Sequence, residues 1–191
     1  MSVLPHRTAW VPIDDHTPLD DAAELAAAWV REQARAHALQ PFAPANGSAG
    51  PRHAVLAYLP DYDDVSRSIQ AARHGAFAAV ESGATPLIGW AMETKAVDLT
   101  TGEVTADTRS PALKEAIERI HFFDSNGWSR GFGADGAKRI LGDLRPADRD
   151  KKVILGSLCA LGSRGKALER LSELADRVWK RRSISIGADS G

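Results

Sequence analysis

Cysteine is nearly absent from this sequence. The 191 residues include one cysteine, Cys159, so no disulfide can form within one chain, which is typical of a protein in a reducing compartment. Cys159 lies in the apolar run ILGSLCAL, which predicts a small core residue rather than a nucleophile. The six histidines show neither HxxxH nor HExxH spacing, so the common histidine-based zinc patterns are missing as well.

Long apolar runs and a secretory signal are also missing. No apolar run approaches the ~20 residues that a helix needs to span a bilayer. The first residues, MSVLPHRTAWVPIDDHTP, lack the basic-then-apolar order of a signal peptide. We therefore expect a soluble, cytoplasmic protein with no membrane partner.

The net charge of −1 hides an uneven distribution of charged residues. Residues 1–127 contain 10 Lys and Arg against 17 Asp and Glu, whereas residues 128–182 contain 14 against 7. This asymmetry indicates either a polyanionic partner for the basic part or two parts of one molecule that attract each other.

With 191 residues and 43% apolar content, the chain can bury one core, so we expect a single domain over 1–191. Its expected parts are an extended arm (1–16), a helix (17–39), a loop rich in proline and glycine (40–52), a core of strand, helix, strand and hairpin (53–105), a basic helical subdomain (110–182) and a frayed tail (183–191).

The clearest β signals lie in the middle of the chain. The apolar run 54–59 predicts a buried strand, an apolar stripe predicts a helix over 64–82, residues 87–95 predict a second strand, and Thr-Thr-Gly at 100–102 predicts a hairpin turn. The predicted fold is α+β: a small central sheet of three to four short strands, at about 53–105, is covered by helices and followed by the C-terminal helical subdomain. Within that subdomain, residues 152–161 fit a buried strand or a helix, and the long window favours a helix.

Residues Pro60-Asp61 and Glu93-Thr94-Lys95 fit the letter pattern PD…(D/E)xK of metal-dependent nucleases. Asp61 and Glu93 would share a Mg²⁺ ion, and Lys95 would stabilise the attacking water or the charged transition state. If 87–95 is a strand, Glu93 and Lys95 share one of its faces. The alternative is structural, because aspartates suit a helix start and a Glu–Lys pair is common at a strand end.

Two shorter patterns have simpler structural explanations. Residues 131–136 spell GxGxxG, which marks a dinucleotide site only after a strand and a tight turn; otherwise the glycines serve a loop with positive φ. His121, Asp124 and Ser125 are too close in the sequence for a catalytic relay, and His121 more simply ends a helix.

The basic C-terminal part is the surface most suited to bind a polyanion. Its helices would meet phosphates through basic side chains, and Trp128 or Phe132 would stack on bases of a single strand. The candidate nucleic-acid-binding residues are Trp128, Arg130, Lys138, Arg139, Lys151, Lys152, Arg164 and Lys166. The alternative is a solvated helical face.

These patterns favour a non-enzymatic binding or accessory protein whose basic helices contact nucleic acid or an acidic protein. One alternative is the Mg²⁺-dependent nuclease with Asp61, Glu93 and Lys95. Another is a protein–protein module, such as a homo-oligomer that joins acidic to basic faces. No cofactor is expected, apart from Mg²⁺ in the nuclease.

Overall fold

The structure is a computed structural model that describes residues 7–188 except 15, 43–52, 73 and 125–126. Its helices are α1 (Leu19–His37), α2 (Tyr62–Ala71), α3 (Ile88–Thr94), α4 (Pro111–Phe122), α5 (Gly131–Asp143), α6 (Lys151–Ala160) and α7 (Gly165–Ala188), with a 3-10 turn, η1, at Pro146–Asp148. Its strands are β1 (Arg7–Val11), β2 (Gln40–Phe42), β3 (His53–Tyr58), β4 (Ala76–Val80), β5 (Val97–Asp98) and β6 (Glu103–Val104). The predicted α+β class is confirmed.

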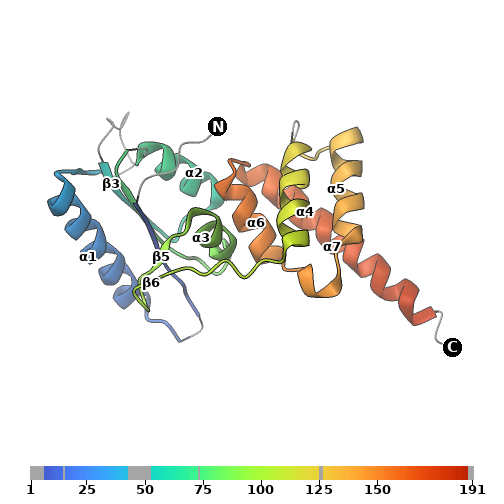
Figure 1. Ribbon diagram of the computed structural model, residues 1–191, viewed down its shortest axis with the longest axis horizontal. Coiled ribbons are helices and arrows are strands. Elements are labelled where there is room, and N and C mark those ends of the chain that lie inside the picture. Colours follow the sequence, from blue (N-terminus) through green and yellow to red (C-terminus); the bar gives the residue numbers. More distant parts are fainter. Residues whose placement is uncertain (1–6, 15, 43–52, 73, 125–126, 189–191) are drawn as a thin grey trace.

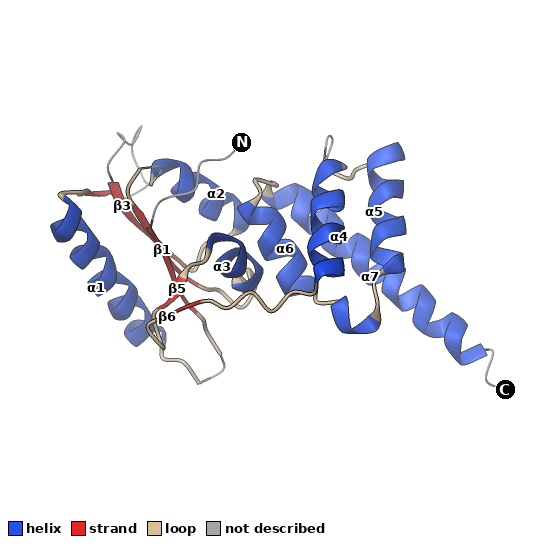
Figure 2. Ribbon diagram, viewed as in Figure 1, coloured by secondary structure: helices blue, strands red, loops and turns tan. Residues whose placement is uncertain are grey.

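The six strands form one mixed sheet in the order β2-β3-β4-β1-β5-β6. All neighbours are parallel except β5 and β6, which form the predicted antiparallel hairpin. Helix α1 covers one face of the sheet, and α2 and α3 cover the other (Figure 1). Beyond α2 and α3 lie α4 to α7, and α7 runs on past its neighbours to the C-terminal end (Figure 2).

Two apolar clusters fill the space between these layers. On the α1 side, alanine and valine side chains such as Ala22, Ala26 and Val80 form a thin cluster. On the other side, one larger cluster continues from the sheet through α3 and α6 into the helical subdomain. The sheet and the helical subdomain therefore share a core.

Strand β4 corrects the prediction of a helix over 64–82. Helix α2 ends at Ala71, and Ala76–Val80 is a strand in the middle of the sheet. All five residues of β4 are buried, because both faces of a central parallel strand are covered, and such a strand shows no alternation of apolar and polar residues. A continuous apolar run does not distinguish a strand from a helix.

The prediction of a strand over 87–95 is also wrong, because Ile88–Thr94 is helix α3. The arm 1–16 contains β1, which lies inside the sheet between β4 and β5, and the predicted loop 40–52 contains β2. The sheet therefore has more strands than predicted and draws two of them from outside 53–105. In the expected frayed tail, α7 continues to Ala188, and residues 189–191 lie outside the described part.

Other predictions are confirmed. The N-terminal helix is α1, residues 152–161 are helical in α6, and the chain after 110 is helical throughout its regular elements. Asp61 is the N-cap of α2, and its carboxylate accepts a hydrogen bond from the Asp64 backbone N–H at 2.6 Å. The Asp64 carboxylate in turn accepts one from the Asp61 backbone N–H, which completes a capping box.

Candidate functional site

A cleft of about 620 Å³ opens where the sheet meets the helical subdomain. It lies at the carboxyl ends of β3 and β4, the edge at which open sheets of parallel strands hold their ligands. Its walls come from the loop after β4, from the start of α2 and from the N-terminal parts of α6 and α7. The lining residues are Asp61, Tyr62, Asp63, Gly83, Ala84, Thr85, Pro86, Lys151, Lys152, Leu155, Gly165, Leu168, Glu169, Ser172 and Glu173.

A contact between distant parts of the chain fixes the floor of the cleft. The Asp63 carboxylate accepts a hydrogen bond from the Gly165 backbone N–H at 2.8 Å, which joins the start of α2 to the start of α7. A Cβ atom on residue 165 would lie 3.0 Å from Cγ of Asp63, so glycine permits this close approach. The first N–H groups of a helix have no partner within the helix, and Asp63 satisfies one of them.

The loop after β4 is held by two side chains. The Glu81 carboxylate accepts from the Leu87 backbone N–H at 3.1 Å, and the Tyr62 hydroxyl donates to the Pro86 carbonyl at 3.2 Å. Burial raises the pKa of both Glu81 and Tyr62 above their usual ranges, because removal from water disfavours the charged forms. This wall of the cleft is therefore fixed by contacts within the protein.

Thr85, on the same loop, is a buried polar residue that lines the cleft. The residue is only 5% exposed. Its backbone N–H donates to both the carbonyl and the hydroxyl of Ser82, each at 3.0 Å, which holds this turn of the loop in place.

The charged side chains of the cleft are mostly acidic. Four carboxylates (Asp61, Asp63, Glu169 and Glu173) stand against two lysines. Lys151 is already paired with Asp176 at 2.8 Å, outside the lining. Among the described residues, neither Glu169 nor Glu173 has an ion-pair partner, and Lys152 forms no ion pair within 4.0 Å.

The residues of the predicted nuclease site lie in different settings. Asp61 lines the cleft, whereas Glu93 is on α3 and Lys95 is the left-handed C-cap of that helix, at φ 53°. The expectation that Glu93 and Lys95 share a strand face is wrong, because this segment is helical. Glu93 is bound to Arg109. The proposed sharing of Mg²⁺ by Asp61 and Glu93 stays a prediction.

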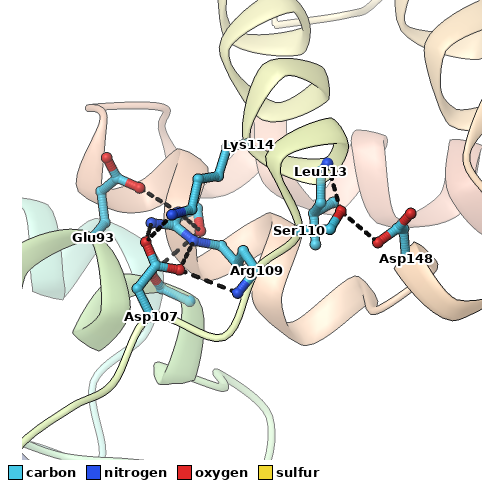
Figure 3. Close-up of polar contacts among 9 residues, drawn as sticks. Glu93, Asp107, Arg109, Ser110, Leu113, Lys114 and Asp148 are labelled. Carbon is cyan, nitrogen blue, oxygen red and sulfur yellow. Dashed lines mark hydrogen bonds and ion pairs between the residues drawn. The ribbon is translucent and has the colours of Figure 1, made fainter.

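Arg109 forms a polar cluster with Asp107 and Glu93 (Figure 3), to which Ser157 also belongs. Its Nε and Nη2 donate to the two oxygens of Asp107 at 2.8 and 2.9 Å, and Nη1 donates to Ser157 Oγ at 3.0 Å and to Glu93. The Arg109 hydrogen bond is the main cause that holds the pKa of Asp107 well below its usual range. All three guanidinium nitrogens donate to partners within this protein, so we assign the cluster a structural role. No pattern in the sequence identifies Arg109 as the common partner of Asp107, Glu93 and Ser157.

Close by, Ser110 caps α4. Its hydroxyl accepts from the Leu113 backbone N–H at 3.0 Å and donates to the Asp148 carboxylate at 2.7 Å (Figure 3). The bond from Ser110, with one from Arg145, lowers the pKa of Asp148. These contacts join the segment before α4 to η1.

The candidate nucleic-acid-binding residues divide into three groups. Trp128 is 3% exposed and its Nε1 donates to the Ile120 carbonyl at 3.1 Å, so the expectation that it stacks on a base is wrong. Lys151 and Lys152 line the cleft. The remaining basic residues are exposed: Arg130, Lys138 (paired with Asp135), Arg139, Arg164 and Lys166.

The other sequence patterns have structural roles. The glycines of 131–136 lie inside α5, and the regular element before them is helix α4 rather than a strand, so the dinucleotide pattern lacks its context. Cys159 is buried, and burial raises the pKa of its thiol to about 12. The Asp124 carboxylate accepts a hydrogen bond from the Ser163 hydroxyl at 2.6 Å, rather than from His121. Ser125 lies outside the described residues.

No protein-family model matches the chain, and comparisons with the curated proteins and with the solved structures also find no match. Within the described part of the chain, no three His, Cys, Asp or Glu side chains are grouped so as to hold a metal ion. No described helix combines the length and apolar character needed to cross a membrane.

Proposed function

We propose that this protein binds a small molecule in the cleft between the sheet and the helical subdomain. The observation that supports this most is the position of the cleft at the carboxyl ends of β3 and β4, with a wall that Glu81 and Tyr62 hold in place. Its size, about 620 Å³, falls within the range of small-molecule sites, and its lining combines apolar surface with a few polar groups.

Filling the cleft tests this proposal. Ser172 lies in the lining on α7, and Ser172→Trp would occupy the space with an indole ring. We expect a member of a panel of amines, amino acids, carboxylates and nucleotides to raise the melting temperature of the unmodified protein by about 5 °C at a hundredfold excess over its Kd. The same compound should have no effect on Ser172→Trp.

Arg177→Trp is the matched control, because Arg177 is exposed on the same helix but does not line the cleft. It should respond to the ligand as the unmodified protein does. If no compound of the panel shifts the melting temperature, or if the shift persists in Ser172→Trp, the proposal is wrong.

Two exposed phenylalanines support a second candidate function. We propose that single-stranded nucleic acid stacks on Phe122 and Phe132, which are 79% and 80% exposed. Both rings belong to one cluster through Phe123, whose ring centroid lies 5.6 Å from Phe122 and 5.0 Å from Phe132. The helices that carry them, α4 and α5, also expose the basic side chains of Arg119 and Arg139.

Replacing both Phe122 and Phe132 with alanine should weaken binding of single-stranded RNA or DNA by about tenfold or more, since stacking contributes ~1–3 kcal/mol per base. The measurement is filter binding at two salt concentrations, at which phosphate contacts predict weaker binding in higher salt. Val104→Ala, which shortens an exposed apolar side chain on β6, should bind as tightly as the unmodified protein. The absence of binding at low salt would rule out this candidate.

A further inference from the structure

We infer that a single strand of nucleic acid stacked on Phe122 and Phe132 lays its phosphates along α7, on a basic row formed by Lys166, Arg170 and Arg177. This inference rests on the proposed stacking on the two phenylalanines and adds the residues that hold the backbone of the same ligand. Proteins that bind single strands without sequence preference combine aromatic side chains with a basic surface that follows the backbone. The basic row supplies the second of these parts.

The basic row lies on one side of α7. Lys166, Arg170 and Arg177 are all exposed. At about 3.6 residues per turn and ~1.5 Å per residue, they point within about 40° of one another around the helix axis and follow one another at about 6 and 10 Å along it. None of the three forms an ion pair with another described residue, whereas Lys138 and Lys151 are each paired with an aspartate. The charge of the row is therefore available to an anionic ligand.

The loop between α4 and α5 connects the basic row to the phenylalanines. A Cβ atom on Gly127 of this loop would lie 3.2 Å from Nη1 of Arg170, so the guanidinium lies beside the loop. Phe122 is the last residue of α4, Phe132 is the second residue of α5, and the ring of Phe123 contacts both. Helix α5 also packs against α7 (Figure 1). The stacking surface and the basic row therefore meet at this loop.

The carboxylates of α7 border the basic row on the side of the cleft. Glu169 and Glu173 line the cleft, and Asp176 is paired with Lys151 at 2.8 Å. The other border of the row, next to the loop between α4 and α5, carries the guanidinium of Arg170. A polyanion is attracted to the loop side of α7 and repelled from the cleft side, so the inferred path leads from the phenylalanines along the loop side.

The salt dependence of binding tests the inference, measured by fluorescence anisotropy with a labelled oligodeoxythymidylate. The logarithm of the binding constant falls with the logarithm of the salt concentration by about 0.7 for each phosphate that a protein contacts on a single strand. Lys166→Gln, Arg170→Gln and Arg177→Gln should therefore each lower the magnitude of this slope by about 0.7, and the triple variant by about 2. Phe122→Ala combined with Phe132→Ala should weaken binding by about tenfold or more at an unchanged slope, because the rings are uncharged.

Arg31→Gln is the matched control for charge, since Arg31 is exposed on α1, which covers the other face of the sheet. It should leave the slope as in the unmodified protein. An unchanged slope in the triple variant overturns the inference. So does a slope that falls as far in Arg31→Gln as in Arg170→Gln, because binding would then respond only to the net charge of the protein.

Failure of the inference can be distinguished from failure of the proposed function. If the double phenylalanine variant weakens binding but the triple variant keeps the full slope, the path of the backbone is wrong and the stacking stands. If no strand binds the unmodified protein at low salt, both are wrong.

Discussion

Replacement of Gly89 with alanine should lower the free energy of unfolding by about 3 kcal/mol or more. A Cβ atom at this position would lie 1.9 Å from the carbonyl oxygen of Val153 and 2.7 Å from its carbonyl carbon. These are backbone atoms of α6, so no side-chain rotation can relieve the overlap. Overpacking typically costs ~1–3 kcal/mol, and a clash with backbone belongs at or above the upper end of this range.

The close approach of α3 and α6 depends on glycine in both helices. A Cβ atom on Gly156 of α6 would lie 2.7 Å from the backbone nitrogen of Trp90, next to Gly89. Together the two glycines let the two helix backbones touch. Since α3 packs against the sheet and α6 belongs to the helical subdomain, this contact sets how the two parts meet.

Urea denaturation, followed by circular dichroism, measures the effect. Gly83→Ala is the matched control, because a Cβ atom at residue 83 would meet nothing within 4 Å and the residue is not in the left-handed region. Its free energy of unfolding should stay within about 0.5 kcal/mol of the unmodified value. A Gly89→Ala protein as stable as Gly83→Ala would show that α3 and α6 do not pack as described.

The α3–α6 contact also bears on the cleft. Helix α6 supplies Lys151, Lys152 and Leu155 to the lining, while the loop that leads into α3 supplies Thr85 and Pro86. A shift between α3 and α6 would therefore move two walls of the cleft relative to each other. The geometry of the candidate site depends on a contact made outside it.

The fold was predictable where local signals and tertiary packing agree. Ser110 followed by Pro111 begins α4 as such a pair usually does, and the polar turn 100–102 joins β5 to β6. The errors arise where packing decides. Strand β4 is buried on both faces and lacks alternation, and the short α3 follows Pro86 with too few residues to show a helical stripe.

The candidate site was less predictable than the fold. Its lining comes from four segments, 61–63, 83–86, 151–155 and 165–173, which are far apart in the sequence. Asp61 and Lys152 were predicted to serve separate functions, in a nuclease and in nucleic-acid binding, yet they line one cleft. Tertiary contacts such as those between Asp63 and Gly165, between Tyr62 and Pro86 and between α3 and α6 bring these segments together, and none of them leaves a local pattern in the sequence.

Replacement of Arg109 with methionine should lower the free energy of unfolding by about 2 kcal/mol at pH 7. Methionine keeps much of the apolar stem but removes every donor to Asp107, Glu93 and Ser157. Breaking a buried ion pair costs ~3–5 kcal/mol, and the cost here should be smaller because the side chains of Glu93 and Asp107 are 28% and 31% exposed. Arg67→Met, which breaks an exposed pair with Asp64, should cost less than about 1 kcal/mol.

The pH dependence of this cost identifies its cause. Arg109 lowers the pKa of Asp107 in the folded state, so their interaction stabilises the protein fully above the unfolded pKa of ~3.9 and is lost as the pH falls toward the folded value. The stability difference between the unmodified protein and Arg109→Met should therefore be constant from about pH 5 to 7 and shrink on acidification to pH 3. Lys114, which also pairs with Asp107, remains in both proteins and does not create this difference.

Urea denaturation at pH 3, 5 and 7 measures the stability difference between the unmodified protein and Arg109→Met. In an Asp107→Asn background, this difference should largely lose its dependence on pH. A difference that stays the same at pH 3 would assign the loss to packing of the arginine stem instead of to its charge.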